Sequence, residues 1–188
     1  MRTHLLTLPV LFLSSLSLLG ACADHGAVRH PHHHEHAHPA AIAAATAAAD
    51  PVAAQLAEVA AVHGAAGPWA VAGYRMGRYA LQKLGLERQS FDLEIVHHSP
   101  PSPMYACVAD GAAAATGASL GKLNLSRVDA DVQHIETTYR RRSSGQSLTL
   151  KPSPSFVARF SNVPRAELLA AGRAVLSLPD PDVFVEAP

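Results

Sequence analysis

Residues 68–84 read PWAVAGYRMGRYALQKL, and this stretch decides the fold. Its apolar side chains recur every three or four positions, which is typical of one buried face of an α-helix. The members of this face are Trp69, Ala72, Met76, Tyr79 and Ala80. Gly85 follows directly, and glycine commonly ends helices. The pattern predicts a core helix over residues 68–84.

Two glycines interrupt this helix. Gly73 and Gly77 each cost about 1 kcal/mol relative to alanine in a helix interior. Residues four apart lie on the same helix face. The pair therefore predicts that another backbone, or a ligand, approaches this face closely.

The surrounding sequence predicts an α+β domain over residues 51–178, with mixed helices and an antiparallel sheet. Asp50 and Pro51 are typical of a helix start, and Gly64 of its end. Further helices are expected over residues 104–116 and 164–176, and strands over residues 91–98, 123–128, 132–141, 147–151 and 156–160. Residues 179–188 are expected to form a loose tail.

The N-terminus has the pattern of a secretory signal peptide over residues 1–21, with a basic start and a short apolar run. Leu19-Gly20-Ala21-Cys22 also resembles the bacterial lipobox, which implies cleavage before Cys22 and lipidation of its thiol. We expect a lipid-anchored protein of the cell envelope that faces the periplasm from the outer membrane. The alternative is an ordinary signal peptide, cut near Ala21 or Ala23.

Residues 22–50 are expected to form a disordered tether rich in histidine and alanine, since they show no apolar periodicity. Neutral imidazoles bind zinc, copper and nickel. The sequence favours a polar spacer with weak metal capture by its clustered histidines, which are His32, His33, His34, His36 and His38.

Composition excludes one class of partner and singles out one thiol. Fifteen basic and fifteen acidic residues give no net charge, so no nucleic-acid partner is expected. The chain has two cysteines. If Cys22 carries lipid, Cys107 has no partner within the chain and is a buried thiol, a ligand or a reactive group.

Four motifs together resemble the FmdE/FwdE family, which takes its name from an accessory component of formylmethanofuran dehydrogenase. They are HGAAGPW at 63–69, GYRMG at 73–77, CVADG at 107–111 and TGASLGKLNL at 116–125. The resemblance implies an α+β domain of the FwdE type, which often binds a divalent metal through its His and Cys residues. It also implies a homodimer, because such domains often pair.

Position by position, His63, Cys107 and Asp110 match the family pattern. Ala65, Gly67 and Ala118 stand where the family has a second histidine and two cysteines. No formylmethanofuran dehydrogenase activity is therefore implied for this chain.

The remaining donors predict a metal site. His63, Cys107 and either His97 or His98 would suit a divalent metal, zinc above all, with one position left open. Asp110 would be a ligand or the acceptor that orients a histidine. Residues of the same motifs are expected to contact a small ligand, namely Gly67, Tyr74, Arg75, Thr116 and Lys122.

Three classes of function follow from these residues. The favoured one is an envelope protein that binds a metal or small ligand, because the chain has no nucleophile elbow, phosphate loop or HExxH motif. The second is an enzyme with Cys107 as nucleophile, His63 or His97 as base and Asp110 orienting the base. The third is an accessory component of an envelope redox complex with an unknown partner.

Overall fold

The computed structural model describes residues 50–188. The predicted signal peptide, the lipidation of Cys22 and the histidine-rich tract at 32–38 lie outside these residues. Within residues 50–188, none of the helices has the length and apolar character that crossing a membrane requires.

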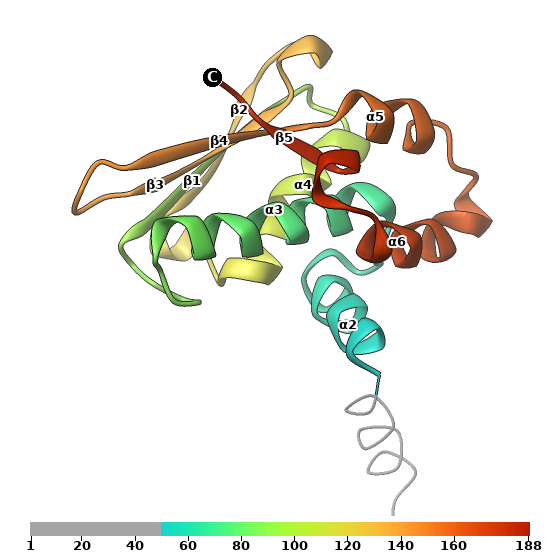
Figure 1. The fold of residues 1–188 in the computed structure, drawn as a ribbon, viewed down its shortest axis with the longest axis horizontal. Coiled ribbons are helices and arrows are strands. Elements are labelled where there is room, and N and C mark those ends of the chain that lie inside the picture. Colours follow the sequence, from blue (N-terminus) through green and yellow to red (C-terminus); the bar gives the residue numbers. More distant parts are fainter. Residues whose placement is uncertain (1–49) are drawn as a thin grey trace, which may run out of the picture. The chain divides into compact units, whose positions relative to one another are not determined.

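Five α-helices and one five-stranded sheet make up the described domain (Figure 1), which confirms the predicted α+β class. The helices are α2 (Pro51–His63), α3 (Pro68–Leu84), α4 (Pro103–Thr116), α5 (Pro154–Phe160) and α6 (Leu168–Ser177). The strands are β1 (Leu93–Ser99), β2 (Leu125–Asp129), β3 (Glu136–Arg141), β4 (Ser147–Pro152) and β5 (Phe184–Glu186).

The strand order is β2-β1-β3-β4-β5, and the sheet is mixed rather than wholly antiparallel. β1 and β2 run parallel, whereas every other neighbouring pair is antiparallel. The parallel pair exists because α4 crosses over between β1 and β2, and such crossovers join parallel strands. This crossover brings β2 and α4 together at one end of the sheet.

α3 and α4 meet at their glycines. A Cβ atom on Gly73 would lie 2.0 Å from the carbonyl oxygen of Val108, and one on Gly111 would lie 1.8 Å from that of Ala70. A Cβ atom on Gly77 would lie 2.9 Å from the Cβ atom of Ala115. The close approach predicted from Gly73 and Gly77 is therefore that of another backbone, α4.

The sheet packs one face against these two helices, as Figure 1 shows. β1 alternates strictly, with Leu93, Ile95, His97 and Ser99 buried and the residues between them only partly buried. This alternation places His97 on the helix side of the sheet and His98 on the other side.

Two expectations for the C-terminal part are wrong. Residues 156–160 belong to helix α5 rather than a strand, because Ser153 caps the helix by accepting from the Phe156 amide at 3.1 Å, and Pro154 starts it. The tail is not loose: β5 pairs with β4, and Phe184 is buried against Tyr79.

Candidate functional site

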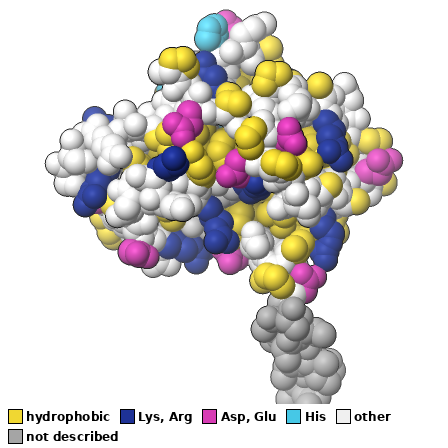
Figure 2. Space-filling view, viewed as in Figure 1, with side chains coloured by type: hydrophobic (Ala, Val, Ile, Leu, Met, Phe, Trp, Pro, Cys, Tyr) yellow, Lys and Arg dark blue, Asp and Glu magenta, His cyan; other side chains and the backbone are white. Residues whose placement is uncertain are grey.

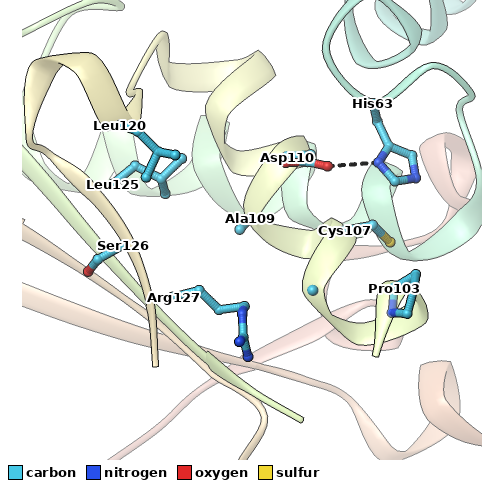
Figure 3. A pocket seen from close by; sticks show the side chains of 10 residues that line it. His63, Pro103, Cys107, Ala109, Asp110, Leu120, Leu125, Ser126 and Arg127 are labelled. Atoms are coloured by element: carbon cyan, nitrogen blue, oxygen red, sulfur yellow. Dashed lines mark hydrogen bonds and ion pairs between the residues drawn. The ribbon is translucent and has the colours of Figure 1, made fainter. Parts of the chain in front are cut away.

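A histidine–aspartate pair lies where α2 ends against α4. His63 is the last residue of α2, which stops because Gly64 takes a left-handed conformation at φ +86°. The Nδ1 atom of His63 lies 2.8 Å from Oδ2 of Asp110 on α4 (Figure 3). Since an ionised carboxylate only accepts, Nδ1 carries the hydrogen of this bond, so in the neutral form of the ring the free lone pair is on Nε2.

Cys107 lies one helical turn before Asp110, on the same side of α4. The residue is 8% exposed, and its thiol donates to the carbonyl oxygen of Met104 at 3.1 Å. The pKa of Cys107 is raised to about 12, mainly by burial and to a smaller extent by the negative charge of Asp110. Cys107 is therefore a neutral thiol at neutral pH.

The helix dipole does not activate this thiol, although Cys107 lies in the N-terminal half of α4. Cys107 is the fifth residue of the helix, whereas the dipole acts mainly within the first turn. Burial therefore outweighs the dipole.

Two cavities meet at His63 and Cys107. The first, which we call the Asp110 cavity, measures about 310 Å³. Its apolar walls include Leu120 and Leu125, and its polar groups include Asp110 and Arg127. The second, the Trp69 cavity, measures about 300 Å³ and is lined almost wholly by apolar side chains, which are those of Pro68, Trp69, Pro103, Met104 and Leu168. His63, Pro103 and Cys107 line both cavities.

Arg127 on β2 is a cavity residue that the sequence did not single out. It extends from the strand on the opposite side of the Asp110 cavity from His63 (Figure 3). It donates to the carbonyl oxygen of Ser99 at 3.1 Å and pairs with Asp129 at 2.7 Å. Its position depends on the parallel pairing of β2 with β1, for which the sequence carried no signal.

His97 does not reach these cavities. It is fully buried, and its Nε2 lies 3.1 Å from the carbonyl oxygen of Tyr105, to which it donates. Its Nδ1 accepts from the hydroxyl of Thr137 at 2.9 Å. Burial lowers the pKa of His97 to about 4, so the ring is neutral and ties the sheet to α4.

The structure does not bring the predicted set of metal ligands together. His63, Cys107 and Asp110 share one cavity, whereas His97 and His98 lie on β1 and line neither cavity. Among residues 50–188, no three His, Cys, Asp or Glu side chains are grouped to hold a metal ion. His63 and Cys107 thus supply two donors where a catalytic zinc site has three.

Four of the five residues predicted to contact a small ligand make hydrogen bonds away from the two cavities, and Gly67 borders the Trp69 cavity. Arg75 donates to the carbonyl oxygens of Val175 (2.6 Å) and Leu178 (2.5 Å) at the end of α6. Thr116 donates to Ala112 in α4 at 2.8 Å.

Tyr74 and Lys122 are also engaged away from the cavities, whereas Gly67 is not. The hydroxyl of Tyr74 donates to Glu58 at 3.2 Å, and the amine of Lys122 donates to the carbonyl oxygen of Gly117 at 2.8 Å. Gly67 precedes α3 and is the one member of the five that borders the Trp69 cavity.

The surface visible in Figure 2 carries basic and acidic side chains interspersed with hydrophobic ones. This face therefore presents no continuous basic patch of the kind that binds nucleic acid.

The comparisons with known proteins give one family. The family model described as FmdE, Molybdenum formylmethanofuran dehydrogenase operon, matches residues 62–185. The matched range begins one residue before His63 and reaches into β5. A search of the curated proteins gave no match.

Proposed function

Because the chain belongs to the FmdE family, we propose that it is a binding protein whose site is formed by His63 and Cys107 with the two cavities they share. The ligand is a small, mainly apolar organic molecule with one polar group. The observation that carries this proposal is the imidazole of His63, held by Asp110 at 2.8 Å on the wall of two apolar cavities.

The chemistry of the two cavities supports an apolar ligand with a single polar group. Ligand sites are commonly concave and apolar, with a few fixed polar groups that orient the ligand. Asp110 fixes the tautomer of His63, so Nε2 accepts a hydrogen bond from a ligand hydroxyl or amide. The thiol of Cys107 already donates to Met104 and adds soft, polarisable surface rather than charge.

The state of Cys107 favours binding over nucleophilic catalysis. A thiolate is the reactive form of cysteine, and a pKa of about 12 leaves almost none at neutral pH. His63 does not offset this, because the thiol of Cys107 donates to the carbonyl oxygen of Met104 and not to the imidazole.

A divalent metal is the second candidate ligand. Histidines that bind metals usually donate their other N–H to a carboxylate, as His63 does to Asp110. His63 and Cys107 would be the donors, and zinc is the metal that this pair suits best. Two donors from the described residues predict weak zinc binding, so the organic ligand remains the main proposal.

Ligand-observed NMR tests the proposal. The full chain would be screened with small aromatic and branched aliphatic alcohols, amides and acids. We expect hits that are lost in His63→Ala and retained in His134→Ala, since His134 is an exposed histidine on another element. Hits that survive His63→Ala would contradict the proposed site.

Calorimetry with Zn²⁺ tests the second candidate. The chain would carry alanine at the five clustered tract histidines, so that they do not bind the metal. One zinc per chain, lost in His63→Ala and in Cys107→Ser, would support the metal candidate. If Zn²⁺ gives no heat of binding, the metal candidate is contradicted and the organic ligand is the remaining proposal.

We also propose that the domain is anchored to the cell envelope through Cys22. The lipobox-like sequence supports this proposal. Labelling cells with a fatty-acid probe would test it: the wild-type chain is expected to carry label and Cys22→Ala to carry none. Unlabelled wild-type chain would favour the ordinary signal peptide.

A further inference from the structure

β2 is an edge strand whose outer side is open in the part of the chain that the structure describes. It stands at the end of the strand order and pairs with β1 alone. Ser126 to Asp129 are all exposed. An edge strand of this kind offers unpaired backbone groups to a further strand.

The ladder shows which backbone groups of β2 are free. The pairing with β1 begins at the carbonyl oxygen of Asn124 (2.9 Å) and extends to the amide of Ala130 (3.1 Å). In a parallel ladder, alternate residues direct both backbone groups to the neighbour. Leu125, Arg127 and Asp129 alternate with the residues that bond to β1. Their backbone N–H and C=O groups therefore point to the open side of β2.

The charged side chains on this edge are complementary to those on the same edge of a second copy. Arg127 and Asp129 lie two residues apart, so they share one face of the strand. If two copies of β2 pair antiparallel with Val128 on the two-fold axis, Arg127 of each copy lies opposite Asp129 of the other. Cross-strand pairs of opposite charge stabilise a sheet, and pairs of like charge destabilise it. Pairing centred on Arg127 would place two arginines opposite each other, so one register is favoured.

Exposed apolar side chains gather beside the same edge. Among residues 50–188, nine large hydrophobic side chains are exposed, and four of them lie within residues 120–132. They are Leu120 (73%), Leu123 (83%), Val128 (43%) and Val132 (46%). A second strand along β2 would cover part of this surface, and burial of apolar area favours association.

We propose that β2 pairs antiparallel with β2 of a second copy of this chain, in the register that sets Arg127 against Asp129. The two five-stranded sheets then form one continuous sheet. Since Arg127 also lines the Asp110 cavity, the cavities of the two copies lie on either side of this interface. The proposal does not depend on the identity of the ligand.

Sedimentation velocity of the full chain over a range of concentrations tests this interface. The wild type is expected to dimerise reversibly. Arg127→Asp or Asp129→Arg should each raise the dissociation constant by about tenfold or more, because both opposite-charge pairs become like-charge pairs. The double variant R127D/D129R should restore dimerisation, as should an equimolar mixture of the two single variants.

Arg165→Asp, an exposed substitution outside the sheet, is the matched control and should dimerise like the wild type. The restored mixture also shows that the single variants are folded. A wild type that stays monomeric, a dimer that both single variants retain, or a mixture that fails to pair would each overturn the proposal.

Discussion

A Cβ atom on Gly111 would lie 1.8 Å from the carbonyl oxygen of Ala70, a distance at which two atoms cannot coexist. Gly111→Ala must therefore push α4 away from α3. We expect it to lower the free energy of unfolding by about 3 kcal/mol or more, the upper range for overpacked cores. Urea denaturation measures this loss.

Gly121→Ala is the control for this substitution, because no atom beyond the adjacent residues of the chain lies within 4 Å of a Cβ at that position. It should change the free energy of unfolding by less than about 0.5 kcal/mol. Equal effects of the two substitutions would contradict the close approach of α3 and α4.

His97 makes the domain sensitive to acid. Its pKa is lowered from 6.5 to about 4 by burial, so the unfolded chain takes up the proton at a higher pH than the folded one. The free energy of unfolding should be independent of this group above pH 6.5. It should fall towards pH 4 by up to about 1.4 kcal/mol per pH unit.

Replacing His97 removes this titration, so His97→Asn should flatten the pH dependence of urea denaturation between pH 6.5 and 4. His134→Asn, at an exposed position, should leave the slope as in the wild type. An unchanged slope in His97→Asn would mean that this buried imidazole does not control the response to acid.

Cys107 should react slowly in the folded protein. Iodoacetamide attacks the thiolate, which is scarce at a pKa of about 12. Mass spectrometry of the peptide that contains Cys107 should show alkylation at pH 7.5 more than about a hundredfold slower than in urea. Asp110→Asn removes one cause of the raised pKa and should speed the reaction. Alkylation as fast as that of a free thiol would restore the nucleophile hypothesis.

Arg75 should matter for stability. It donates to two carbonyl oxygens at the end of α6, so Arg75→Ala leaves both without their charged donor. The expected loss in the free energy of unfolding is about 2 kcal/mol or more. Arg78→Ala, which removes an exposed guanidinium 5.9 Å from the ring of Tyr74, should cost less than about 1 kcal/mol. If the two variants are equally stable, Arg75 does not hold α6.

The sequence predicts local features of this fold well because they depend on neighbouring residues. Asp50, Gly64, Gly85 and Gly117 mark helix ends by their own conformational preferences. Phe156 and Phe160 suggest a strand because aromatic residues favour strands, although Ser153 and Pro154 start a helix there.

The candidate site was predictable only in part. Cys107 and Asp110 are three residues apart on one helix, so their proximity follows from helical geometry. The role of His97 depends on Tyr105 and Thr137, which the fold brings to it. Arg127 reaches the cavity through the strand order, which local patterns do not encode.

The long-range ¹H–¹⁵N NMR spectrum of the histidine side chains, recorded while a molecule found in the screen is added to the full chain, tests the central claim most directly. Before addition, His63 should carry a hydrogen on Nδ1, as its bond to Asp110 requires. On addition, the Nε2 resonance of His63 should shift while that of His134 stays constant. A bound molecule that leaves His63 unchanged, or a free protein in which Nδ1 of His63 carries no hydrogen, would contradict the account.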